Sequence, residues 1–445
     1  MIGLIGIIIA VALFIFMAFK GLNLVVSAII STCIMIIFNG MPIYEVLIGT
    51  YVGADGVATG YMTYVAGCIK SYFLLFALSS LLGRIMLDGG AARKIALSCS
   101  KIVDRASEAN KKLVCALMVP FLYIILAYVG ISGFVIVFTV MPIAKELFES
   151  TNTPWKFYCL GGGQTAGVIF LAGSVQAANV YAAEVCGTST TSGALFSIIL
   201  YAVWIIATII LAKALMKKAL ANGETFLTDG AAVKNSSLGA VMPDEQLPNI
   251  WLSVIPLVLV IVLSAGFKVP VVPALLAGCV LAMIFLWKNI KSQWKSTLAN
   301  GVTSCFAAVF TVAATYGMGS VIRLMPGFEI VLNGLDSLPG LFGGSALIMV
   351  MSFIMCDNMS AVAAFGSTAL NSFAASGISP AIAHRMMNVV GFAAMSPHSP
   401  GIANAQAVTK IDYKKCLSMY MLSTFIPGIC CTIVAFVLIL LGIFH

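Results

Sequence analysis

Residues 192–212, SGALFSIILYAVWIIATIILA, form a run of 21 residues without a single charge. A helix needs about 20 apolar residues to cross the hydrocarbon of a bilayer. Seven other stretches approach or reach this length, at 1–19, 22–38, 71–87, 250–267, 271–287, 303–322 and 417–444. The sequence therefore predicts an all-α polytopic membrane protein.

The composition excludes an ordinary soluble domain. Hydrophobic residues make up 61% of the chain and charged residues only 9%, against about 25% charged residues in soluble proteins. The net charge of +8 comes from basic residues in loops that flank apolar stretches, and this pattern does not indicate a nucleic-acid partner. The 12 cysteines are scattered and form no CxxC pair, so we expect no disulfide framework, metal site or cofactor.

The loop charges predict an orientation in the cell membrane. Cytoplasmic loops of membrane proteins carry an excess of Lys and Arg. A topology with both termini extracellular puts all but four of the 24 basic residues on the cytoplasmic side. The four exceptions are Lys70, Lys268, Arg323 and Arg385.

This topology divides the chain into two halves. Residues 1–217 form the first half, residues 218–249 a polar cytoplasmic linker and residues 250–445 the second half. Each half has five spanning helices and one re-entrant hairpin, at 113–149 and 343–376. Because five crossings is an odd number, we expect an inverted repeat, the architecture of many secondary transporters.

Each half also contains a helix that the sequence breaks near the bilayer midplane. Thr153-Pro154 and Ser379-Pro380 both look like an N-cap followed by proline at the first helical position. The breaks follow at Gly173-Ser174-Val175-Gln176 and at Ser396-Pro397-His398-Ser399-Pro400-Gly401. Backbone groups freed inside hydrocarbon must line a cavity or meet protein, so the two breaks predict a solute site.

The hairpin tips predict the same chemistry. Their residues are Gly130-Ile131-Ser132-Gly133 and Cys356-Asp357-Asn358-Met359-Ser360. Hydroxyls, amides and free helix N-termini suit a small anionic organic acid. The candidate substrate contacts are Ser132, Gly133, Gly173, Ser174, Gln176, Asn179, Asp357, Asn358, Ser360, Arg385, Ser399 and Asn404.

Ionisable residues inside a membrane are costly and are commonly functional. Arg385 can grip a carboxylate through a two-pronged hydrogen bond, or it can pair with Asp357 or contribute to helix packing. The candidate proton-coupling groups are His398, Asp357 and His384. Burial disfavours the charged form of both residue types, so both can titrate near neutrality. We favour His398 slightly because it lies in a break.

The motifs resemble the gluconate permease family of the ion-transporter superfamily, and most closely its hydroxybutyrate-permease-like members. The stretch GCIKSYF at 67–73 with DGGAAR at 88–93 is similar to the third span of that family and its exit. GSVQAAN at 173–179 with GTSTT at 187–191 resembles a second pair of family elements. His384-Arg385 with SPHSPG at 396–401 resembles a third pair. Val175 stands where the family has proline, and the last motif lacks the family's Asp and Leu.

The resemblance implies cation-coupled uptake of small organic acids, usually with protons, and an elevator-like motion. The substrate would be gluconate, 3-hydroxybutyrate or a related hydroxy-carboxylate. Sodium-coupled carboxylate or dicarboxylate symport is the main alternative, and the oligomeric state is left open, a homodimer included. A channel and an intramembrane protease are remote alternatives, the latter because Gly130-Ile131-Ser132-Gly133 matches a short protease motif. No GxxxxGK[ST] pattern for ATP binding occurs.

Overall fold

The computed structural model describes residues 2–53, 56–107, 110–128, 131–174, 176–235, 243–263, 267, 269–328, 330 and 340–445. Gly130, Val175 and Lys268, which the sequence analysis named, lie outside this described part. Within it the chain is almost entirely helical. The strands β1 (Tyr51–Val52) and β2 (Ala58–Thr59) form one short antiparallel pair. The all-α membrane fold predicted from the sequence is confirmed.

Seven helices of the described part are long and apolar enough to cross a membrane. They are α1 (Ile2–Phe19), α4 (Tyr61–Asp88), α6 (Lys111–Tyr128), α10 (Ala194–Ala221), α13 (Val271–Ile290), the nearly continuous α14 (Trp294–Thr303) and α15 (Phe306–Val321), and α21 (Tyr413–Leu440). The shorter helices α2 (Leu24–Phe38), α12 (Ile250–Ile261) and α17 (Gly340–Met355) are also apolar.

The outer surfaces of these helices carry large apolar side chains. Leu195 and Ile210 on α10 and Ile433 and Leu440 on α21 are all more than half exposed. A water-soluble protein does not leave a contiguous apolar surface of this kind uncovered. These faces are therefore the surface that contacts lipid.

Two elements differ from the sequence-based expectation. The predicted span at 303–322 begins earlier, at Trp294, because α14 packs on α4 and Thr297 donates a hydrogen bond of 2.7 Å to Asp88. The basic loop after the third span contains an amphipathic helix, α5 (Ala91–Val103). The sequence-based prediction missed this helix because its charged residues interrupt the apolar pattern.

Helical hairpins lie at both expected positions, and both expected helix breaks are present; that the hairpins are re-entrant stays a prediction. The first hairpin pairs α6 with α7 (Gly133–Ser150), and the second pairs α17 with α18 (Asn358–Ala375). The first broken helix consists of η1 (Trp155–Cys159), α8 (Leu160–Ile169) and α9 (Ala177–Val185). The second consists of α19 (Pro380–Val389), η5 (Val390–Ala394) and α20 (Pro400–Thr409).

One of the two expected helix caps is confirmed. Ser379 is the N-cap of α19, and Pro380 occupies its first turn. In the first half the N-cap position belongs to Pro154 itself, and the first turn is a 3-10 helix. The Thr153 hydroxyl instead lies 2.8 Å from that of Thr151, and one of the two donates a hydrogen bond to the other.

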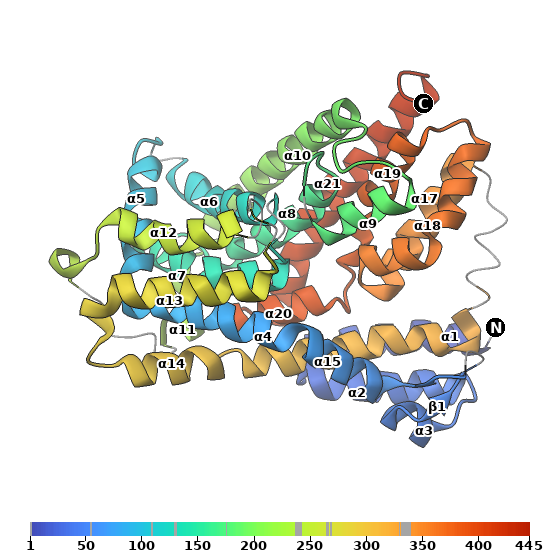
Figure 1. The fold of residues 1–445 in the computed structure, drawn as a ribbon, viewed down its shortest axis with the longest axis horizontal. Helices are drawn as coiled ribbons and strands as arrows, with labels where there is room; N and C mark the ends of the chain where they lie inside the picture. Colours follow the sequence, from blue (N-terminus) through green and yellow to red (C-terminus); the bar gives the residue numbers. More distant parts are fainter. Residues whose placement is uncertain are drawn as a thin grey trace.

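Figure 1 shows both termini at one end of the bundle, which we call the terminal end, and α11 (Phe226–Asn235) toward the opposite end, the linker end. The predicted linker thus contains a helix, together with η2 (Asp244–Gln246). Asp229 on α11 pairs with Lys415 at 2.5 Å, and Lys234 pairs with Glu149 at 3.0 Å. These ion pairs attach α11 to the first turn of α21 and to the last turn of α7.

Candidate functional site

A cavity of about 150 Å³ lies where the two hairpin tips meet the two broken helices. Seven of the residues proposed from the sequence line it: Ser132, Gly133, Gln176, Asp357, Asn358, Ser399 and Asn404. Segments separated by more than 250 residues thus contribute to one site. The other proposed residues, Gly173, Ser174, Asn179, Ser360, His384, Arg385 and His398, do not line it.

Four helices begin at this cavity. Ser132, Gln176, Asp357 and Ser399 are the N-cap residues of α7, α9, α18 and α20. The first N–H groups of a helix have no intrahelical partner, and the helix dipole places partial positive charge at that end. Four such ends around one small volume create a positive potential without a basic side chain.

Glycines allow the walls of the cavity to approach each other closely. A Cβ atom on Gly162 would overlap the ring of Tyr420, and one on Gly391 would overlap the amide of Asn358. Both glycines line the cavity and neither was proposed from the sequence. The run Gly161-Gly162-Gly163 was the one local signal that could have indicated this part of the site.

The tip of the second hairpin has a strained backbone. Cys356 adopts φ +53°, in the left-handed region that side-chain-bearing residues rarely occupy. Asp357 follows, and its carboxylate accepts hydrogen bonds from the Ser360 N–H at 2.9 Å and from the Ser360 hydroxyl at 2.5 Å. Among the lining residues that the structure describes, Asp357 is the only carboxylate, and no Lys, Arg or His accompanies it. Backbone strain of this kind commonly marks functional sites.

Asn404 provides an unused acceptor in the same cavity. Its side chain is fully buried, and Nδ2 donates to the Phe134 carbonyl at 3.2 Å. Oδ1 has no hydrogen-bond partner within the described part of the chain. Burying an amide oxygen without a partner is costly, so this oxygen is a candidate acceptor for a bound molecule.

Gln176 also makes structural contacts with the first hairpin, while its role as a substrate contact stays a prediction. Nε2 donates to the Ala127 carbonyl at 2.6 Å and to the Ile131 carbonyl at 3.0 Å. Both carbonyls belong to the first hairpin near its tip. Gln176 therefore joins the break of the first broken helix to that tip, while its side chain still borders the cavity.

A second polar cluster lies outside the cavity and centres on Asn179. Its Oδ1 is within hydrogen-bond distance of His384 Nε2 at 2.9 Å, Arg385 Nη1 at 2.8 Å and Asn388 Nδ2 at 3.2 Å. Asn388 in turn accepts from Asn358 at 3.1 Å, and Asn358 lines the cavity. The cluster thus connects the first broken helix to the tip of the second hairpin.

Arg385 is fully buried in this cluster. Nε donates to the Ser192 carbonyl at 2.7 Å and Nη2 to the Thr190 carbonyl at 2.6 Å, while Nη1 also reaches the Phe170 carbonyl at 3.4 Å. Phe170 is the C-cap of α8, the end at which the helix dipole favours a cation. This geometry favours a positioning role for Arg385 over direct contact with a carboxylate.

The two candidate histidines are buried outside the cavity. His398 is within 3.3 Å of both the Ser396 hydroxyl and the Ile354 carbonyl, and its ring packs against Phe353. His384 contacts the Thr188 hydroxyl at 2.9 Å. Of the three groups proposed for proton coupling, only Asp357 borders the cavity. A coupling role for any of them stays a prediction.

The sequence matches no family model. It is 23% identical over 461 aligned positions to the uncharacterized transporter YxjC of Bacillus subtilis (strain 168), and the match covers 93% of each chain. A crystal structure of the YdaH transporter of Alcanivorax borkumensis aligns with 88% of this chain and 90% of its own, at 14% identity and a TM-score of 0.41. The chain is therefore similar, over nearly its whole length, to a bacterial protein described as a transporter.

Proposed function

We propose that this protein is a secondary active transporter that takes up a small organic acid together with protons. The observation that carries the proposal is the cavity bounded by four helix N-termini, at Ser132, Gln176, Asp357 and Ser399. Discontinuous helices whose N-termini point at an anionic group are a recurring feature of secondary transporters. The full-length similarity to the uncharacterized transporter YxjC supports a transport function.

The proposed inverted repeat, with halves at 1–217 and 250–445 around the linker 218–249, accounts for the order of elements. In each half two helices precede the next long span, a hairpin follows, and then come a broken helix and a final long span. Both termini lie at the same end of the bundle (Figure 1). We propose that the terminal end is extracellular, because the basic loops flank the other ends of the spans.

The cavity favours a short hydroxy acid. Its volume of about 150 Å³ is below the roughly 300–1,000 Å³ of sites for drug-sized ligands. A four-carbon acid such as 3-hydroxybutyrate suits this volume better than the six-carbon gluconate. A hydroxyl on the substrate would donate to Asn404 Oδ1, the acceptor that lacks a partner in the described structure.

The proposed coupling group is the Asp357 carboxylate. It faces the same cavity as the proposed substrate, so a negative charge on Asp357 opposes binding of a carboxylate, and a proton on Asp357 removes that opposition. Sodium coupling is the second candidate, favoured by the same carboxylate and the Asn404 amide oxygen, since hard cations prefer oxygen ligands.

Uptake by purified protein in liposomes tests the proposal. Labelled 3-hydroxybutyrate should accumulate when the outside is made acidic, and shorter or longer hydroxy acids should compete with it. Accumulation driven by a sodium gradient at equal pH would show that the coupling ion is sodium and not the proton. If no carboxylate accumulates under either gradient, while the reconstituted protein remains folded, the proposed substrate class is wrong.

A further inference from the structure

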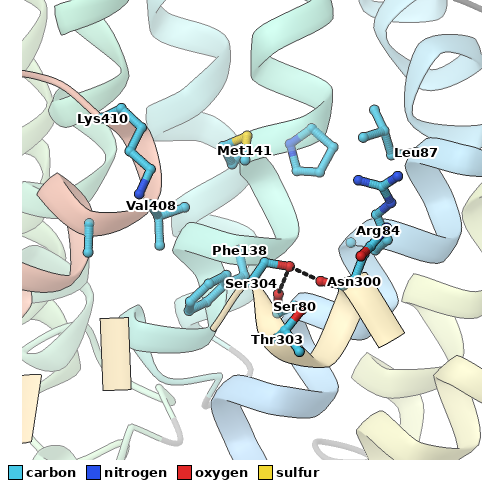
Figure 2. Close-up of a pocket in the computed structure, with 13 residues that line it drawn as sticks. Ser80, Arg84, Leu87, Phe138, Met141, Asn300, Thr303, Ser304, Val408 and Lys410 are labelled. Atoms are coloured by element: carbon cyan, nitrogen blue, oxygen red, sulfur yellow. Dashed lines mark hydrogen bonds between the residues drawn. The ribbon is translucent and has the colours of Figure 1, made fainter. Parts of the chain in front are cut away.

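A second and larger cavity, of about 360 Å³, lies between α4 and α14 on one side and α7 and α20 on the other (Figure 2). Its walls are mixed: α7 contributes apolar side chains, and the other helices contribute polar or basic side chains together with the apolar Leu87, Ala407 and Val408. The polar and basic lining residues are Ser80, Arg84, Asn300, Thr303, Ser304 and Lys410. We call this cavity the vestibule.

The vestibule continues from the first cavity along two shared helices. On α7, Phe134 lines the first cavity and Phe138 lines the vestibule. On α20, Asn404 lines the first cavity and Val408 lines the vestibule. Residues four positions apart lie on the same helix face, one turn apart. The two cavities therefore follow each other along one path, and the vestibule is nearer the last turn of α7, where Glu149 pairs with Lys234 of α11.

An aromatic cluster separates the two cavities. Tyr72 and Phe76 on α4 pack against Phe134, with ring centroids 5.3 and 5.5 Å away, and Phe76 also packs against Phe138 at 5.7 Å. Phe134 belongs to the first cavity and Phe138 to the vestibule. A molecule moving between the cavities along α7 would have to displace these rings.

The vestibule has a basic lining. Arg84 and Lys410 approach it from opposite sides in Figure 2. Arg84 is also bonded to Asp88 at 2.8 Å, which offsets part of its charge. Lys410 is exposed and has no ion-pair partner in the portion of the chain that is described. None of the described lining residues is a carboxylate, so the net potential favours an anion.

The backbone at Lys410 gives a second, independent indication. Lys410 is the C-cap of α20 and adopts φ +59°. Glycine is the usual residue for this left-handed position, because other side chains are strained there. Residues held in such a conformation cluster at functional sites, so the strain points to the same position as the charge.

We propose that the vestibule is a second anion site, at which Lys410 and Arg84 hold the substrate carboxylate between the first cavity and the linker end. The assignment rests on the proposed function for its ligand, a small organic acid. The basic charge of the vestibule, however, can be measured without any transported substrate. Lys410 supplies the unpaired charge, and Arg84 supplies a partly offset one.

A thiol-labelling experiment measures this charge. Thr303 lines the vestibule and is exposed, so the Thr303→Cys protein in detergent can be treated with an anionic sulfonate or a cationic trimethylammonium methanethiosulfonate. The rate in the parent protein is subtracted. The ratio of anionic to cationic modification should fall at least about threefold in Thr303→Cys/Lys410→Gln, as expected for loss of one charge several ångströms away.

Matched variants separate charge from structure. Lys414 is exposed in the first turn of α21 and does not line the vestibule, so Lys414→Gln should leave the ratio unchanged. Lys410→Arg should keep the ratio, whereas Lys410→Gly should lower it without a loss of thermal stability. An equal fall with Lys414→Gln, or an unchanged ratio with both Lys410→Gln and Lys410→Gly, would overturn the assignment.

The transport arm tests the ligand. In sided vesicles Lys410→Gln should raise the half-saturating 3-hydroxybutyrate concentration at the linker end several-fold and leave the value at the terminal end unchanged. A fall in labelling ratio in a protein that transports no organic acid would reject the proposed function and keep the anion site. Normal transport with an unchanged ratio would reject the anion site and keep the proposed function.

Discussion

Arg385 Nη1 donates to Asn179 Oδ1 at 2.8 Å, although the two residues come from different halves of the chain. Asn179 lies in the first turn of α9, just after the first break, and Arg385 lies on α19, before the second. The guanidinium also binds the carbonyls of Thr190 and Ser192, in the turn before α10. The buried Arg385 side chain thus contacts both sides of the first helix break, the end of α8 and the start of α9, and holds them against α19.

Replacing Arg385 with lysine should destabilise the protein. A lysine keeps the charge but cannot supply the planar set of donors that reaches Ser192, Thr190 and Asn179 together. Leaving buried carbonyls without a donor should lower the free energy of unfolding by about 2 kcal/mol or more. Thermal unfolding in detergent measures this loss. Unchanged stability combined with a raised half-saturating substrate concentration would instead indicate that Arg385 contacts the substrate directly.

Asn404→Leu should selectively weaken recognition of a hydroxyl group. If Asn404 Oδ1 accepts a hydrogen bond from the substrate, its loss should raise the half-saturating concentration of 3-hydroxybutyrate about tenfold. The affinity for butyrate, which lacks the hydroxyl, should change little. Competition uptake assays with the two acids give both values. Equal losses for both acids would show that Asn404 acts on the shape of the cavity and not on the hydroxyl.

Gly391→Ala should impair transport strongly, because the added Cβ would overlap the Asn358 side chain beside the cavity. Overpacking of a close contact typically costs about 1–3 kcal/mol. Gly67→Ala on α4 is the matched control, since a Cβ there meets nothing within 4 Å. Initial uptake rates, normalised to folded protein, should fall only for Gly391→Ala. A normal uptake rate for Gly391→Ala would show that transport does not depend on the position of the Asn358 side chain.

The hydropathy pattern and the helix breakers were enough to predict the spans, hairpins and breaks. Both signals are local: an apolar run needs lipid, and prolines such as Pro397 and Pro400 interrupt a helix wherever it packs. The extracellular position of both termini stays a prediction.

The residues that sequence reasoning missed depend on contacts between distant segments. Gly391 matters because the Asn358 amide covers it, and Gly162 because the Tyr420 ring does. Neither partner is adjacent in sequence. Arg385 was identified as important, but its partners are backbone carbonyls of the first half. No side-chain pattern in the sequence could show that these carbonyls use its donors.

The proposed orientation predicts opposite labelling of two exposed positions. Asn222 lies just after α10, before the linker helix α11, and Ala375 lies at the base of the second hairpin. In intact cells an impermeant thiol reagent should modify Ala375→Cys but not Asn222→Cys. Background labelling of the parent protein is the control, because it already contains 12 cysteines. Labelling of Asn222→Cys and not of Ala375→Cys would show that the protein has the opposite orientation in the membrane.

The coupling group is the subject of the last prediction. Asp357 borders the first cavity, whereas His398 and His384 are held in hydrogen bonds outside it. A proton on Asp357 would remove the negative charge beside the substrate carboxylate, so uptake by the unmutated protein should increase as the outside becomes more acidic. Asp357→Asn is permanently neutral, and its substrate exchange should be insensitive to pH.

Two assays on the same liposomes separate binding from coupling. Asp357→Asn should exchange labelled for unlabelled substrate but fail to concentrate it under an imposed pH gradient. His398→Gln should still concentrate it, because the His398 ring contacts Ser396 and Ile354 and not the cavity. The reverse pattern, accumulation by Asp357→Asn and none by His398→Gln, would assign the proton to the histidine. A response of the unmutated protein to sodium and not to pH would exclude proton coupling by either residue.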